Sequence, residues 1–150
     1  MKNYLLPIAL FGTTALVTYA LPSTALSPPE IQQIANRSTV SIDRCDRGSG
    51  TIVRKDRNTY TVLTLAQSVR NSACEIVTPD NRRYQVSQVK AFPNSIDLAL
   101  VSFITNNNYP VATLVANSDR VEAGERIYVG GFGQTSASSK PVFTFAKGDL

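Results

Sequence analysis

The chain has 150 residues, of which 43% are hydrophobic and 17% charged, a composition that excludes a disordered protein. The formal net charge is only +4, and the basic residues are scattered without a run that could follow a phosphate backbone. We therefore expect a globular chain with one domain-sized core and no nucleic-acid partner.

The N-terminus has the three parts of a secretory signal peptide. Lys2 precedes an apolar run from Leu5 to Leu21, and the small residues Ser23 and Ala25 follow it. The run falls short of the ~20 apolar residues that span a bilayer, so we expect no stable membrane anchor. Residues 1–25 are therefore predicted to be a signal peptide cleaved near Ala25, which leaves a secreted or periplasmic protein.

The cysteine and histidine content restricts the chemistry. Two cysteines, Cys45 and Cys74, are present, and in an oxidising compartment they predict one disulfide, although two buried free thiols are the alternative. Metal sites of the usual kinds need clustered histidine, cysteine or carboxylate ligands, and this sequence has no histidine. We expect no metal site and no cofactor.

The first structural element after the leader is predicted to be a short helix. Ser27-Pro28-Pro29-Glu30 places an N-cap serine before a proline at the first helical position, with a glutamate three residues after the serine. The helical segment is predicted over 26–37, with Ile31 and Ile34 on the face that packs on the rest of the protein.

From Thr39 onwards the hydrophobic period changes to two, which is typical of β-strands. Turn signals separate the runs, and a polar loop is expected at 134–140 before a last strand. This pattern predicts an all-β domain over 38–150, either a closed antiparallel barrel or a sandwich, between which periodicity does not choose. The predicted strands cover Val40 to Ile42, Thr51 to Val53, Tyr60 to Leu65, Glu75 to Thr78, Tyr84 to Val89, Leu98 to Phe103, Arg126 to Val129 and Val142 to Phe145.

The stretch that organises the chain is Gly48-Ser49-Gly50-Thr51-Ile52-Val53, followed by Thr61-Val62-Leu63-Thr64 and a short helical turn from Ala66. It resembles the first half of a trypsin-like serine peptidase. The resemblance continues through Asp97-Leu98-Ala99-Leu100 and through Val129-Gly130-Gly131-Phe132-Gly133, which resembles the strand and turn that close the first barrel. It implies a single antiparallel six- to seven-stranded β-barrel, corresponding to the N-terminal barrel only.

The resemblance also implies where the catalytic residues would lie. The family's catalytic histidine falls on Gln67 and its aspartate on Asp97, and the cysteine pair brackets Gln67 as a disulfide brackets that histidine in the family. A primary amide cannot take a proton from a serine near neutral pH. The Gly-x-Ser-Gly-Gly segment that carries the nucleophile is not found before Leu150. We therefore expect a chain that is not an enzyme, with no active catalytic residue.

Three hypotheses remain open at this point. The first is a non-catalytic module that binds a protein or peptide partner, or forms a homodimer, through an exposed apolar barrel face. The second is one half of a split serine endopeptidase, completed by a second chain that carries the serine barrel. The third is a β-sandwich, adhesin-like domain in which Gln67 and Asp97 lie far apart.

Two interpretations of Asp97 also remain open. Asp97 either accepts hydrogen bonds from the Gln67 amide or nearby backbone, or is a solvated carboxylate at a strand start.

Overall fold

The computed structural model describes residues 26–70, 73–94, 96–133 and 141–150. The predicted signal peptide at 1–25 and the predicted loop at 134–140 lie outside the described residues. Among the helices of the described ranges, none has the length and apolar character needed to cross a bilayer.

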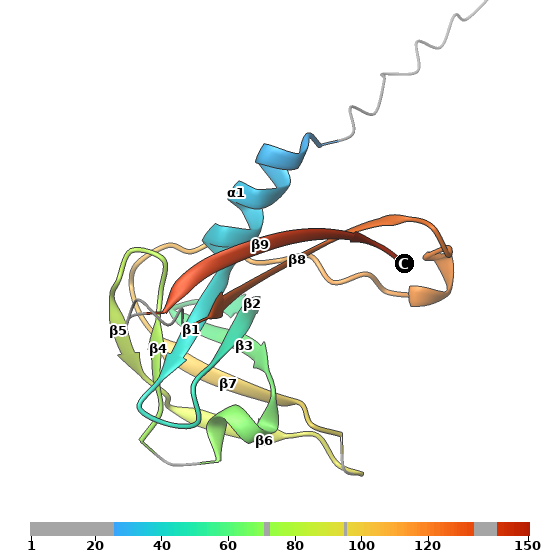
Figure 1. Cartoon of the computed structure of the whole chain (residues 1–150). Helices are drawn as coiled ribbons and strands as arrows, with labels where there is room; N and C mark the ends of the chain where they lie inside the picture. The colour runs from blue at the N-terminus through green and yellow to red at the C-terminus, as the bar shows by residue number, and fades with distance from the viewer. Residues whose placement is uncertain (1–25, 71–72, 95, 134–140) are drawn as a thin grey trace, which may run out of the picture.

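Seven strands form one curled antiparallel sheet in the order β5-β4-β1-β2-β3-β7-β6 (Figure 1). The predicted all-β fold with six to seven antiparallel strands is therefore confirmed. The strands are β1 Thr39–Asp43, β2 Gly48–Asp56, β3 Thr59–Thr64, β4 Glu75–Val77, β5 Arg83–Gln85, β6 Gln88–Ala91 and β7 Ala99–Ile104.

The single strand predicted from Tyr84 to Val89 is two strands at opposite edges of this sheet. β5 pairs with β4, whereas β6 pairs with β7. Between them, the Val86 N–H donates to the Cys74 carbonyl at 3.2 Å and the Ser87 N–H to the Ser102 carbonyl at 2.8 Å. Val86 and Ser87, which are neighbours in the chain, therefore hydrogen-bond to opposite edges of the sheet and connect them. The hydrophobic pattern continues through the bend, which is why the sequence did not reveal it.

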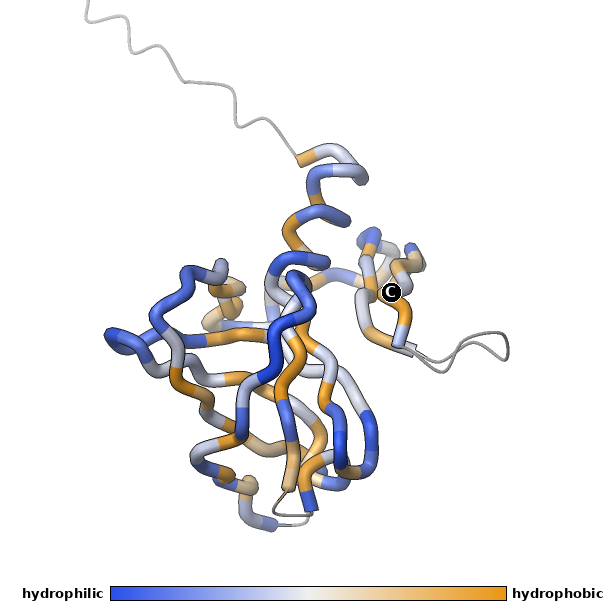
Figure 2. Tube along the Cα trace, turned by 90° about the vertical axis from the view of Figure 1, so that its left-hand side faces the viewer, coloured by the Kyte–Doolittle hydropathy of each residue, from blue (hydrophilic) through white to orange (hydrophobic). Residues whose placement is uncertain are grey.

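Side chains that alternate along the strands fill the inside of the curl. Figure 2 shows hydrophobic and hydrophilic residues following one another along the strands. On β1 both faces are buried, because Val40 and Ile42 point into the core while Ser41 lies on the opposite face, against other parts of the chain. Burial of this apolar surface provides the main driving force for the fold. The core consists of Val40, Ile42, Ile52, Tyr60, Val62, Val69, Cys74, Ile76, Ala99, Val101, Phe103 and Tyr109.

The last two strands form a separate sheet. β8 Arg126–Gly133 pairs antiparallel with β9 Val142–Asp149 over its whole length, and this hairpin crosses above the seven-stranded sheet in Figure 1. The expectation that residues 129–133 close the first barrel is therefore wrong. The bend between β5 and β6 closes the curl instead, so β8 is left to pair with its neighbour in sequence.

The short N-terminal helix is confirmed as α1 Pro28–Ser38. Its first turn is fixed by the Glu30 carboxylate, which accepts a hydrogen bond from the Ser27 N–H at 2.8 Å. The expected apolar packing is small, because Ser38 is the one buried residue of the helix and Ile34 is 49% exposed. α1 contacts β8 near Gly130, where an added Cβ would lie 3.4 Å from the Ala35 Cβ.

Candidate functional site

Gln67 lies in a single helical turn that begins directly after β3. This turn, η1 Ala66–Val69, is held by the Ser68 N–H, which donates to the Leu65 carbonyl at 3.1 Å. Ser68 is buried against β2, where a Cβ on Gly48 would lie only 2.5 Å from the Ser68 Oγ. Glycine at position 48 therefore lets the turn approach the strand, while the Gln67 side chain stays exposed.

The predicted disulfide joins Cys45 to Cys74, with a Cα–Cα distance of 5.2 Å. The Cys45 Sγ lies 3.0 Å from the Ser68 carbonyl oxygen, so the disulfide contacts the turn that carries Gln67. The covalent link, the buried serine and the glycine opposite it together fix the backbone at this position.

Asp97 meets Gln67 through the backbone. The Asp97 Oδ1 accepts a hydrogen bond from the Gln67 N–H at 2.8 Å, and both residues are exposed. The Gln67 side-chain amide makes no hydrogen bond to any residue that the structure describes. The hydrogen-bond donor to Asp97 is therefore the backbone N–H of Gln67 and not its side-chain amide. A sandwich with these two residues far apart does not agree with this contact.

The chemistry available at this position is hydrogen bonding rather than proton transfer. Gln67 offers one amide donor group and one carbonyl acceptor, and neither titrates near neutral pH. The sequence has no histidine, and both of its cysteines are committed to the disulfide. Among the described residues, no group of three or more metal-ligating side chains is close enough to hold a metal ion.

A cavity of about 470 Å³ opens beside Gln67 and is lined by two arginines, Arg47 and Arg70. Neither guanidinium forms an ion pair with any described residue, although Asp46 lines the same cavity. Neither arginine was predicted to be a site residue from the sequence. Their positions close to the two cysteines could have indicated them: Arg47 lies two residues after Cys45, and Arg70 lies four residues before Cys74.

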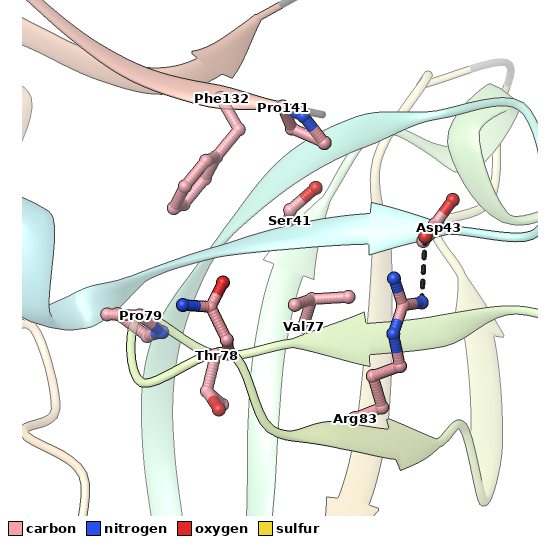
Figure 3. A pocket seen from close by; sticks show the side chains of 9 residues that line it. Ser41, Asp43, Val77, Thr78, Pro79, Arg83, Phe132 and Pro141 are labelled. Atoms are coloured by element: carbon pink, nitrogen blue, oxygen red, sulfur yellow. Dashed lines mark hydrogen bonds and ion pairs between the residues drawn. The ribbon is translucent and has the colours of Figure 1, made fainter. Parts of the chain in front are cut away.

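A second cavity of about 430 Å³ lies between the curled sheet and the β8–β9 hairpin (Figure 3). At one side of it, Arg83 donates to the Asp43 carboxylate at 2.8 Å and to the Glu75 carboxylate at 3.0 Å. The bond from Arg83 is the main reason why the pKa of Asp43 lies below its ordinary value, and the Arg44 N–H lowers it further. The charges at this end of the molecule are therefore mutually compensated.

A polar contact joins the hairpin to the sheet between these two cavities. The Phe132 N–H donates to the Ser49 Oγ at 2.6 Å, and the same hydroxyl donates to the Phe132 carbonyl at 3.1 Å. A Cβ on Gly131 would lie 3.3 Å from the Ser49 Oγ, so a glycine beside Phe132 leaves room for the contact. We call this pair of hydrogen bonds the Ser49–Phe132 contact.

A curled antiparallel sheet with a helical turn after its third strand, and a carboxylate bonded to that turn, has the architecture of a peptidase β-barrel. The family model of the trypsin-like peptidase domain matches residues 48–150, and the chain belongs to this family. None of the curated proteins matches the chain.

Proposed function

We propose that this trypsin-like domain binds polypeptide without hydrolysing it. The observation that carries the proposal is the glutamine at residue 67, the position to which the resemblance assigns the family's histidine, with its backbone N–H bonded to Asp97. A glutamine there can orient a ligand by hydrogen bonds but cannot act as a general base. The sequence contains no histidine that could take over this role.

The proposal is tested by incubating the purified, oxidised protein with fluorescein-labelled casein and with fluorogenic peptides. We expect no turnover above buffer, and the same result for the Gln67→Ala variant. A rate that follows the protein through successive purification steps and falls in the variant would show that the site is catalytic. A rate that is lost during purification would come from a contaminating protease, whereas one that co-purifies with the protein would contradict the proposal whatever the variant does.

Export of the protein is the second part of the proposal. The disulfide supports an oxidising compartment, and the leader pattern at 1–25 supports secretion or delivery to the periplasm. Intact-mass analysis of the exported protein should find an N-terminus at Leu26. A mature chain that still begins at Met1 would contradict this.

A protein partner is supported by apolar side chains that the fold leaves exposed. Leu114 is 62% exposed, Val115 is 73% exposed and Val129, on β8, is 63% exposed. A two-stranded hairpin such as β8–β9 is also marginal on its own and gains stability from further strands. We propose that a second protein, or a second copy of this chain, covers these exposed side chains. Sedimentation of a strictly monomeric species at all concentrations would argue against the second copy.

The same hairpin is the observation that favours a second candidate function, a split serine endopeptidase completed by another chain. In that case a serine-directed fluorophosphonate probe should label a protein that co-purifies with this one. Labelling of no partner, together with retained peptide binding, favours the non-catalytic module.

A further inference from the structure

Three neighbouring cavities lie along the seam between the curled sheet and the β8–β9 hairpin. The cavity at Gln67 and the cavity in Figure 3 are joined by a third of about 240 Å³. This third cavity shares Arg47 with the first and shares Ser41 and Phe132 with the second. The three cavities therefore form one elongated path, which we call the seam groove.

Ser41 lies in the floor of the seam groove with a hydroxyl that the protein does not use. The residue is only 3% exposed, and its side chain forms no hydrogen bond with any described residue. In Figure 3 it points from β1 towards Phe132 and Pro141. Among the described residues no fully buried side-chain polar atom lacks a hydrogen-bond partner, so the Ser41 hydroxyl is reached from the groove and is available to a ligand there.

The walls around Ser41 mix apolar and polar side chains, with Val77, Pro79 and Phe132 beside Thr78 and Asn81. Arg83 also lines this end, but its charge is compensated by Asp43 and Glu75. This part of the seam groove therefore suits an uncharged segment that offers hydrogen-bonding groups, as the backbone of an extended peptide does.

The opposite end of the groove is positively charged. Arg47 and Arg70 both line the Gln67 cavity, and Asp46 is the one carboxylate among its described lining residues, so the cationic groups outnumber the anionic one. A guanidinium without an ion-pair partner binds a carboxylate through two parallel hydrogen bonds, which gives the contact direction as well as strength. The Gln67 amide lies in the same cavity and can bond to a neighbouring peptide group.

We propose that the seam groove binds an extended polypeptide segment with an acidic side chain beside Gln67 and its backbone over Ser41. The inference deepens the proposed function and rests on it, because it names the ligand class and the path that the ligand follows. The row of three cavities and the change from a charge-compensated to a cationic lining fit a peptide better than a small anion.

Fluorescence anisotropy with labelled, terminally blocked octapeptides tests the ligand class. The acidic probe alternates threonine with glutamate, and two matched probes carry glutamine or lysine in place of glutamate. We expect the acidic probe to bind at least tenfold more tightly than the glutamine probe and the lysine probe to bind weakest. The preference should decrease as sodium chloride is raised from 50 to 500 mM, since salt screens exposed charges.

Two sets of variants locate the ligand. Arg47→Gln and Arg70→Gln should lower affinity for the acidic probe to that of the glutamine probe. The matched control is Arg57→Gln, in the turn between β2 and β3, which should leave affinity unchanged. Ser41→Ala should weaken all three probes to the same extent while leaving the melting temperature unchanged, because the hydroxyl has no partner within the described structure.

Equal binding of the acidic and lysine probes, or arginine variants with unchanged affinity, would overturn the acidic ligand class. Absence of binding by all three probes would overturn the seam groove as a peptide site. In these cases the proposal of a non-hydrolytic domain stands. Cleavage of a probe, detected by mass spectrometry, would instead overturn the proposed function itself.

Discussion

Removing the Ser49 hydroxyl should release the β8–β9 hairpin from the curled sheet without unfolding the sheet. This hydroxyl accepts from the Phe132 N–H at 2.6 Å and donates to the Phe132 carbonyl at 3.1 Å. Ser49→Ala removes both bonds and leaves both backbone groups of Phe132 without a protein partner. The strands of the sheet keep their own ladders, because the β2 backbone pairs with β1 and β3.

The expected cost follows from the two hydrogen bonds that are lost. Each neutral hydrogen bond contributes about 1 kcal/mol, and the penalty for the orphaned groups is reduced here because Phe132 and Ser49 are only half-buried and water can replace the hydroxyl. We therefore expect about 2 kcal/mol less free energy for opening the hairpin. That is a factor of about 30 in the opening equilibrium, since 1.4 kcal/mol corresponds to tenfold.

Native-state hydrogen exchange measures this opening residue by residue. In Ser49→Ala, amides of β8 such as Val129 should lose about 30-fold protection, which corresponds to the 2 kcal/mol above, whereas the Val62 amide in the core should be unchanged. Ser87→Ala removes a hydroxyl bonded to the Ser102 carbonyl elsewhere in the sheet and serves as the control. Unchanged protection in β8, or an equal loss at Val62, would refute the view that Ser49 holds the hairpin.

Four further predictions concern the core, the ion pairs and the site. Replacing both Cys45 and Cys74 by alanine should lower the free energy of unfolding in urea by about 3.6 kcal/mol, because the disulfide no longer restricts the unfolded chain over a sequence separation of 29. A decrease of less than about 1 kcal/mol would contradict this entropic explanation. Because the pKa of Asp43 is lowered from 3.8, mainly by Arg83, its ion pair stabilises the protein above pH 4 and is lost as the pH falls through the folded value. The wild type should therefore lose stability more steeply than Asp43→Asn between pH 4 and pH 2, and parallel pH profiles would show that the pair contributes nothing. Tyr109→Phe should cost about 1 to 3 kcal/mol, since its buried hydroxyl bonds to Tyr84 at 2.8 Å and to Asp80 at 3.1 Å, while Tyr128→Phe should change the free energy of unfolding by less than about 0.5 kcal/mol. Gln67→His should change the free energy of unfolding by less than about 0.5 kcal/mol and give no hydrolysis. The new imidazole, followed by NMR, should titrate above its ordinary pKa of about 6.5, because the Asp97 carboxylate is close by. A pKa below that value would mean that the two side chains do not face each other.

The local parts of this structure could be predicted from the sequence, whereas the non-local parts could not. Ser27 and Glu30 define the helix start through residues three apart, and the turn between β2 and β3 is fixed by its own residues. The bend between β5 and β6 arises because β5 pairs at one edge of the sheet and β6 at the other. The alternation of hydrophobic and polar residues is the same before and after the bend, so it gives no sign of the change of edge. The Ser49–Phe132 contact joins residues 83 positions apart, so no local pattern could indicate it.

In the candidate site, too, the residue at position 67 is read from the sequence, whereas the contacts that hold its turn come from distant parts of the chain. The residues that hold the turn, namely the disulfide, Gly48 and Ser68, are packed or covalently joined, so the turn keeps its geometry whatever stands at position 67. The Gln67 side chain is exposed and contributes no hydrogen bond within the described structure, and Asp97 bonds to the backbone, which every residue type supplies. A change of side chain at position 67 should therefore leave the fold of the turn and of the cavity beside it intact. In the proposed non-catalytic domain, the groove would not depend for its stability on the side chain at this position.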